Sequence, residues 1–183
     1  MKRFLYRCRN WRSELHMLLV EAGVFLARMF GVLTMYGTVS ATIYRADGSV
    51  EHLGAIGKRV VTNAGVAFLV DDWDDGSESI TNMNFHDSGT SSTAENVTDV
   101  DLGTPAGPTT RATGTKSQPS ANVIRSVGTI AYTSTLAIVE HGLFSTAART
   151  TDDLWDRTVF SVINVVNGDS IQFTYDCTLT AGS

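Results

Sequence analysis

The sequence predicts a mainly β protein, an antiparallel β-sandwich of jelly-roll-like type with one short helix, preceded by an N-terminal amphipathic helix. Apolar and polar residues alternate with a period of two in several segments, as expected where one face of a sheet is buried. Two turn dipeptides, Asp47-Gly48 and Asn167-Gly168, separate such segments. The 183 residues are 43% hydrophobic and 18% charged, which is too apolar for a disordered chain and too poor in charge for solvated helices.

Residues 1–34 differ in kind from the rest of the chain. Their six Lys and Arg against two Glu give a charge of +4, whereas the remaining eight basic and seventeen acidic residues give −9. Glu21 and Arg28 interrupt the apolar run, so no membrane span is predicted. Apolar residues three and four positions apart predict an amphipathic helix: Leu15, Leu18, Leu19, Ala22, Phe25, Leu26, Met29 and Leu33. We therefore divide the chain into a basic helical arm, residues 1–34, and a β-sandwich domain, residues 35–183.

Three interpretations of the arm remain open. A basic start and the small residues from Val39 to Ala41 fit a secretory signal peptide, but Glu21 and Arg28 would lie inside its apolar region. The second interpretation is a helix that docks on a partner protein. The third is a start codon placed too early, because an alternating strand begins directly at Met35.

The first half of the domain predicts two strands and a helix. Residues 37–45 alternate between apolar and polar, Asp47-Gly48 supplies a turn, and residues 49–62 form the returning strand. Thr62 or Asn63 then caps a short helix. We expect this helix to carry Val66, Leu69 and Val70 on one side.

Residues 71–128 are rich in Gly, Ser, Thr, Asn and Asp and hold all three prolines, which predicts long connections broken by one strand near residues 80–85. After Asn122 the strands return, at residues 123–134, 136–145, 154–166 and 170–180. Asn167-Gly168 lies between the last two. This dipeptide supplies positive φ at both central positions of a type I′ turn, so a β-hairpin is predicted there.

The segment HDSGTSS, residues 86–92, is the sharpest enzymatic signal. Its Asp87-Ser88-Gly89-Thr90 core follows an apolar strand and resembles the active loop of aspartic proteases, in which two aspartates share a proton. Dimerisation would have to supply the second aspartate. The apolar-apolar-Gly strand that supports this loop in such proteases is missing from the later sequence. An aspartic protease therefore stands as an alternative function.

Metal binding and nucleic acid binding receive little support from the sequence. The acidic segment DDWDDGS, residues 71–77, suits calcium in charge but fails the EF-hand spacing, which would place Trp73 and Asn82 at ligand positions. The histidines (His16, His52, His86, His141) and cysteines (Cys8, Cys177) lack metal-ligand spacing. Basic residues are scattered singly over an acidic domain, which excludes a phosphate-binding footprint. We predict no catalytic, cofactor-binding or metal-binding residues, and hence no enzyme and no cofactor.

The stretch AIVEHGLF, residues 137–144, places Glu140 and His141 inside an apolar run. On a strand the two side chains point to opposite faces, so they cannot act together on one substrate atom. A buried carboxylate is unfavourable unless it is paired, and the best candidate partner is Arg157 on the next predicted strand. We therefore predict a buried Glu140–Arg157 pair that fixes the register of the strands.

The order of four segments resembles a family of bacteriophage virion proteins. The segments are VTNAGVAFLVDDW, NFHDSGTSSTAENVTDVDLGTPAG, AIVEHGLFSTA and LWDRTVFSVINVVNGDSIQFTYDCTLT. They are similar to the N-terminal region of phage tail-collar fibre proteins and to small phage structural proteins. The match covers residues 37–181 and leaves the first 34 unexplained. Asp87 stands where the family often has Gly, and no fibre shaft follows Ser183, so a stand-alone domain is implied.

The resemblance implies a non-enzymatic virion protein, assembled in the host cytoplasm, that forms a homo-oligomer, by resemblance a trimer. It would attach to major capsid or tail proteins as a decoration (cement), head-fibre or collar-type subunit. A carbohydrate-binding adhesin domain is the main alternative, with Trp73 and Trp155 as aromatic platforms for a host-surface glycan. Nucleic acid is not an expected partner, and no membrane span is expected.

Overall fold

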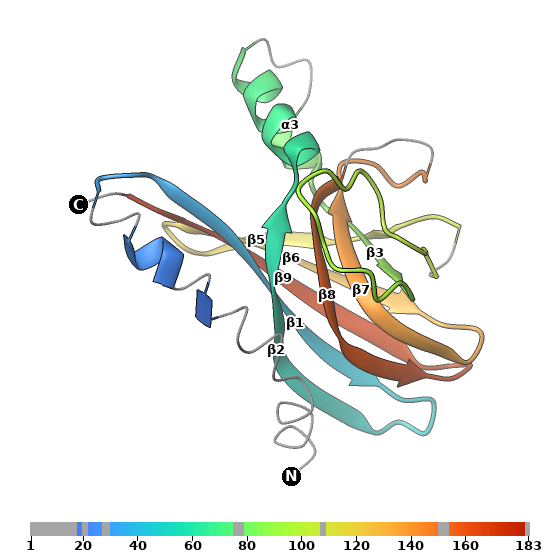
Figure 1. Cartoon of the computed structure of the whole chain (residues 1–183). Coiled ribbons are helices and arrows are strands. Elements are labelled where there is room, and N and C mark those ends of the chain that lie inside the picture. The colour runs from blue at the N-terminus through green and yellow to red at the C-terminus, as the bar shows by residue number, and fades with distance from the viewer. Residues whose placement is uncertain are drawn as a thin grey trace.

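The computed structural model describes residues 18–19, 22–26, 30–74, 79–106, 109–149 and 154–181. Within them the chain is mainly antiparallel β (Figure 1). The strands are β1 (Thr34–Tyr44), β2 (Val50–Val61), β3 (Phe85–Gly89), β4 (Ala112–Thr113), β5 (Thr115–Ser120), β6 (Val123–Ala131), β7 (Leu136–Phe144), β8 (Leu154–Val165) and β9 (Ser170–Thr180). The helix α3 (Asn63–Asp74) and the 3-10 turn η1 (Ile80–Asn82) lie between β2 and β3.

The strands form one nine-stranded sheet in the order β4-β3-β7-β8-β2-β1-β9-β6-β5. Strand β2 joins two halves, because it pairs with β1 along most of its length but with β8 only at Val60 and Val61. The sheet curves until its ends approach each other, and only Gly114 separates β4 at one end from β5 at the other. The expected jelly-roll-like sandwich of two separate sheets is thus not confirmed; the sheet is single and nearly closed.

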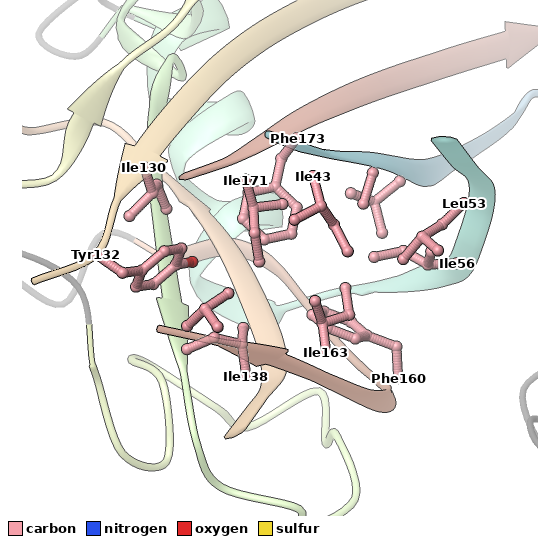
Figure 2. Packing of buried hydrophobic residues seen from close by; sticks show 13 residues of the cluster. Ile43, Leu53, Ile56, Ile130, Tyr132, Ile138, Phe160, Ile163, Ile171 and Phe173 are labelled. Carbon is pink, nitrogen blue, oxygen red and sulfur yellow. The ribbon is translucent and has the colours of Figure 1, made fainter. Parts of the chain in front are cut away.

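The main hydrophobic core fills the inside of this curved sheet (Figure 2). Val39, Ala41 and Ile43 point into it from β1, as their alternation predicted. Ile171 and Phe173 of β9 meet them from the neighbouring strand. A second cluster closes the end nearest α3 and consists of Phe68, Met83, Leu143, Trp155, Tyr175 and Cys177. The period-two pattern therefore identified the buried face of these strands correctly.

Most predicted strands are present, with three differences in the central region, one of which is the unpredicted two-residue strand β4. The strand expected near residues 80–85 is instead the η1 turn followed by β3. Strand β5 was not predicted, because its sequence TKSQPS is polar and contains Pro119. All six of its residues are exposed, and it lies at one end of the sheet order, where a proline is tolerated because one side of the strand needs no ladder hydrogen bond.

The two turn dipeptides have different outcomes. Asp47-Gly48 connects β1 and β2, which pair as an antiparallel hairpin, and Gly48 has a φ of 83°. Asn167-Gly168 also reverses the chain, with Gly168 at φ 91°, but Asn167 has no positive φ. Strand β8 pairs with β7 and β2, whereas β9 pairs with β1 and β6. The predicted type I′ hairpin is therefore wrong, because this turn carries the chain from one half of the sheet to the other.

Helix α3 begins where Thr62 accepts a hydrogen bond at its Oγ1 from the backbone N–H of Gly65, 3.0 Å away, so the predicted cap is confirmed. Its buried residues are Gly65 and Phe68, and Leu69 packs against the second cluster. The other two residues of the expected apolar stripe, Val66 and Val70, are 49% and 54% exposed. The three residues lie on one side of the helix, as predicted, and the structure leaves both valines of that side exposed. Figure 1 shows α3 projecting beyond the end of the sheet.

Only part of the N-terminal arm falls within the described residues. Residues 18–19 and 22–26 are helical, and Leu18, Leu19, Phe25 and Leu26 are all more than half exposed. The predicted helix does not extend to residue 34, because residues 30–33 are turn and coil and Thr34 begins β1. Over residues 1–17, 20–21 and 27–29 the prediction lies outside the described residues. Among the described residues, no helix combines the length and the apolarity needed to cross a bilayer.

Candidate functional site

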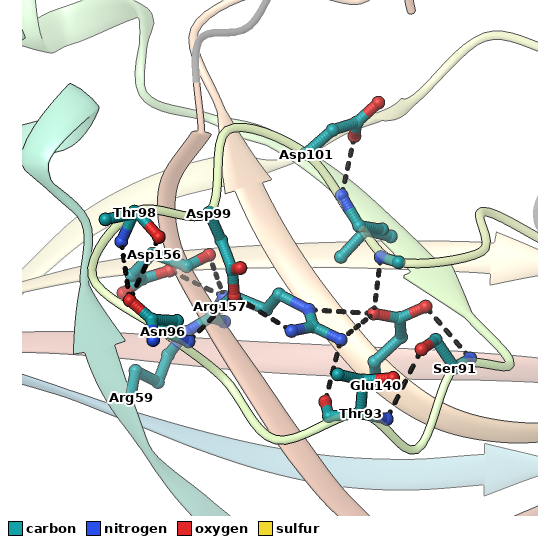
Figure 3. Close-up of polar contacts among 12 residues, drawn as sticks. Arg59, Ser91, Thr93, Asn96, Thr98, Asp99, Asp101, Glu140, Asp156 and Arg157 are labelled. Atoms are coloured by element: carbon teal, nitrogen blue, oxygen red, sulfur yellow. Dashed lines mark hydrogen bonds and ion pairs between the residues drawn. The ribbon is translucent and has the colours of Figure 1, made fainter.

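Glu140 of β7 is completely buried and faces the loop of residues 90–106, which lies over the sheet (Figure 3). Its Oε1 accepts hydrogen bonds from the backbone N–H groups of Ser91 at 3.0 Å and Thr104 at 2.9 Å. Its Oε2 accepts one from the N–H of Gly103 at 3.0 Å. A single carboxylate thus holds both ends of this loop against the sheet.

Arg157 of β8 is the partner of Glu140, as predicted. Its Nε and one terminal nitrogen each lie 2.8 Å from Glu140 Oε2. The guanidinium also donates to Asp99 Oδ2 at 2.8 Å and to the carbonyl of Thr93 at 3.1 Å. The buried pair therefore does more than set strand register, because it also fixes the middle of the loop. Sequence reasoning missed Asp99, since nothing in the local pattern distinguishes it from its acidic neighbours.

Asp87 of the HDSG segment is buried and paired with arginine. Arg149 donates to both of its carboxylate oxygens, at 2.8 and 2.7 Å, and Arg111 lies 3.8 Å away. The guanidinium of Arg111 in turn lies 3.5 Å from the ring centre of Phe144. An aspartic protease needs an accessible carboxylate that shares a proton with a second one. A carboxylate that is 1% exposed and held by guanidinium groups gives that alternative no support.

His141 points to the opposite face from Glu140, as predicted, and enters the interior against the ring of Phe173. Arg59 of β2 lies 2.6 Å from His141 Nδ1 and also donates to the backbone carbonyls of His141 and Asp156. A second ion pair joins Arg59 to the Asp156 carboxylate at 2.5 Å. The hydroxyl of Tyr175 accepts a hydrogen bond from the indole N–H of Trp155 at 2.9 Å.

A chain of hydrogen bonds runs on from His141 across the inside of the sheet. His141 Nε2 lies 3.0 Å from His86 Nδ1, and His86 Nε2 lies 2.8 Å from the hydroxyl of Ser126. Ser126 donates to Asn84 Oδ1 at 2.7 Å. Because Arg59 can only donate, His141 must accept at Nδ1 and carry its proton on Nε2, and His86 must do the same. All donors in this chain therefore point in one direction.

Both histidines are held in the neutral form. Burial, reinforced by the positive charge of Arg59, lowers the pKa of His86 to about 3. The same causes hold the pKa of His141 well below its usual value. Burial acts in the other direction on Asp156 and raises its pKa to about 6, although Arg59 opposes the shift. The interior chain thus consists of two neutral imidazoles, and it ends at the ion pair of Arg59 and Asp156.

The histidine chain closes the sheet where strand pairing does not. Strands β3 and β6 approach at the seam of the curved sheet, and His86 of β3 bonds to Ser126 of β6. The ring of His86 also lies directly against Gly128, where any Cβ would overlap it. These residues are buried, so their observed role is structural. No sequence signal pointed to them, because His86 and Ser126 are 40 residues apart.

The remaining predicted residues lie in separate places. Trp155 is 3% exposed, so it cannot stack on a sugar, whereas Trp73 of α3 is 78% exposed. The two expected aromatic platforms therefore do not form one surface. Asp71, Asp72 and Asp74 lie in the last turn of α3, and residues 75–78 lie outside the described part. Among the described residues, no group of three or more His, Cys, Asp or Glu could hold a metal ion.

One shallow hollow opens where β2 and β8 separate. Ile43, Arg45, Glu51, Leu53, Val162 and Asn164 are among its lining residues. Arg45 spans it, donating to the carbonyl of Asn164 at 2.7 Å and to Asp169 Oδ2 at 2.9 Å. The arginine is thereby engaged within the protein, and the hollow presents no cluster of catalytic side chains.

Comparison of the chain with protein-family models, with curated proteins and with solved structures finds no match. Any proposal about function therefore depends on the arrangement of the residues described above. They form two buried ionic clusters and one histidine chain, which fix a loop and close a sheet.

Proposed function

We propose that this protein is a non-enzymatic bacteriophage virion structural protein that self-assembles, as a trimer, and attaches to the capsid or tail. It acts as a decoration (cement), head-fibre or collar-type subunit. The observation that carries the proposal is the loop of residues 90–106, which Glu140 and Arg157 hold in one conformation through hydrogen bonds from the sheet beneath it. The sequence resemblance described above supplies the kind of particle.

A loop held in this way suits assembly. Ordering a flexible loop at an interface opposes binding by roughly 0.5–1.5 kcal/mol for each immobilised side chain, so a loop ordered beforehand associates more tightly. The bonds that order it come from buried groups, which leaves Ser92, Asn96 and Thr98 exposed for contacts with a neighbour. Enzymatic function would instead require reactive groups that reach a substrate.

Exposed apolar side chains also favour self-association. Val97 and Val100 of the loop are each 48% exposed, and Trp73 of α3 is 78% exposed. Large contiguous apolar patches on soluble proteins mark interaction sites. The proposal also includes the helical arm of residues 1–34, which contacts a neighbouring structural protein. It further treats the two halves of the sheet as the two layers of a sandwich-like domain.

Two measurements test this function. Native mass spectrometry of the isolated full chain at micromolar concentration is expected to give three subunits. Protein mass spectrometry of gradient-purified particles from the phage or prophage that encodes the chain is expected to find it in many copies per particle. A monomer in the first measurement would overturn self-assembly, and absence from purified particles would overturn the virion assignment.

A further inference from the structure

Helix α3 carries an apolar stripe that is exposed in the described part of the protein. Val66, Val70 and Trp73 are spaced four and three residues apart, so they lie on one side of the helix. They are 49%, 54% and 78% exposed, while the opposite side buries Gly65 and Phe68. Val97 of the loop is also exposed. It lies beside the start of the helix, where its backbone carbonyl accepts a hydrogen bond from the N–H of Asn63 at 2.8 Å.

The C-terminal end of α3 carries acidic side chains, although negative charge is unfavourable at that end of a helix. Residues 71–78 contain five acids and no basic residue. Three of them, Asp71, Asp72 and Asp74, lie in the last turn of the helix, next to the negative end of its dipole. A cationic partner at this end would therefore be stabilising.

The arm has the complementary character: its described residues supply exposed apolar side chains, and its basic residues, which all lie outside the described part, supply positive charge. Leu18, Phe25, Leu26 and Phe30 are between 55% and 81% exposed. The arm as a whole carries six basic residues and two acids, a net charge of +4 over residues 1–34. It therefore offers an apolar stripe with positive charge, and α3 offers an apolar stripe with negative charge. Figure 1 shows the described helical residues of the arm lying apart from α3, so these residues do not contact the α3 stripe of their own chain.

We propose that the arm of one copy docks on the Val66–Val70–Trp73 face of α3 in a second copy. The apolar stripes pack as two helices, and the basic residues of the arm meet the acidic end of α3. Such a contact joins two different surfaces, and it forms a ring, as the proposed trimer requires, when the rotation that relates successive copies closes. The inference rests on the self-assembly proposed above but not on the location in a virion.

Two paired variants of the full chain test the contact. Phe25→Asp/Leu26→Asp removes the arm surface, and Val66→Asp/Val70→Asp removes the helix surface. Each variant alone is expected to sediment as a monomer, with the dissociation constant raised roughly 100-fold or more, since both changes place charge in the core of an interface. Val50→Asp is the matched control, because Val50 is also a 48% exposed valine but lies at the start of β2. It is expected to assemble like the natural protein.

Mixing the two variants gives the decisive result. Each retains one intact surface, so an equimolar mixture is expected to form a dimer and stop there. A mixture that stays monomeric, or single variants that assemble fully, would overturn the proposal. Circular dichroism confirms that each variant is folded. If an apolar variant fails to fold, Asp71→Lys/Asp74→Lys replaces it, because these residues lie outside the buried side of α3, and an unchanged assembly would again reject the contact.

The outcomes separate this contact from the wider function. If the natural protein is a trimer and both surface variants remain trimers, self-assembly stands and only the arm contact is rejected. If the natural protein is a monomer at every concentration tested, the contact and the self-assembly fall together.

Discussion

The carboxylate of Glu140 and the guanidinium of Arg157 lie 2.8 Å apart on adjacent strands, and between them they bind five groups of the loop above. The loop contributes three backbone N–H groups to the carboxylate, and one carbonyl and one carboxylate to the guanidinium. Neither charge is left without hydrogen bonds in its buried position. This pair therefore connects the strands to the loop of residues 90–106.

Glu140→Ala is expected to lower the free energy of unfolding by about 3–5 kcal/mol, because it removes the buried carboxylate that pairs with Arg157, leaving only Asp99, and because three loop N–H groups lose their acceptor. Asp176→Ala provides the control. Asp176 pairs with Arg125 at 2.7 Å, but these side chains are 25% and 40% exposed. Exposed pairs contribute only about 0–1 kcal/mol. Urea denaturation of both variants measures the difference, and equal losses would contradict the structural role of Glu140.

The same substitution is expected to release the loop. In Glu140→Ala, the amides of Ser91, Gly103 and Thr104 lose their acceptor, so their hydrogen exchange should accelerate roughly tenfold or more. The amide of Ala46, which donates to Asp169 at 2.9 Å in a distant turn, should keep its rate. Exchange followed by mass spectrometry gives both values. A loop that exchanges as slowly as before would show that Glu140 does not hold it.

Acidification is expected to destabilise the protein through its buried histidines. An unfolded histidine binds a proton below a pH of about 6.5, whereas His86 does so only near pH 3 in the fold. The unfolded state thus binds more protons between these values, so the free energy of unfolding falls as the pH falls. His141 acts in the same direction. Asp156 opposes them between about pH 6 and 4, since its pKa is raised to about 6, but two histidines outweigh one carboxyl.

Urea denaturation at several pH values between 7 and 4 measures this dependence. His86→Asn is expected to reduce the slope of unfolding free energy against pH by close to one proton, about 1.4 kcal/mol for each pH unit. The variant is also less stable at pH 7, so the slope is the informative quantity. A slope identical to that of the natural protein would show that His86 does not remain neutral in the fold.

Gly65→Ala tests how closely α3 packs on the sheet. In an exposed helix this change stabilises by up to about 1 kcal/mol, since alanine has the higher helix propensity. At residue 65, however, a Cβ would overlap the backbone carbonyl of Trp155, which cannot move as a side chain can. We therefore expect a lower melting temperature. Ala67→Gly, at an exposed position of the same helix, is the control and should cost only about 1 kcal/mol.

Several features of the protein follow from the sequence by itself. The alternation in residues 37–45 identified the inward face of β1, Thr62 was recognisable as a helix cap, and Arg157 was predicted as the partner of Glu140. These inferences succeed because they depend on geometry that repeats within a few residues, or on the rule that a buried charge needs a partner.

Other features were decided only by the tertiary structure. Asn167-Gly168 specifies a reversal of the chain but not which strand becomes the neighbour, and β8 and β9 separate into different halves of the sheet. Arg59 and His141 meet across 82 residues of sequence. The pairing of distant strands depends on how the whole sheet curves and closes around its core, and no local pattern of residues records that curvature.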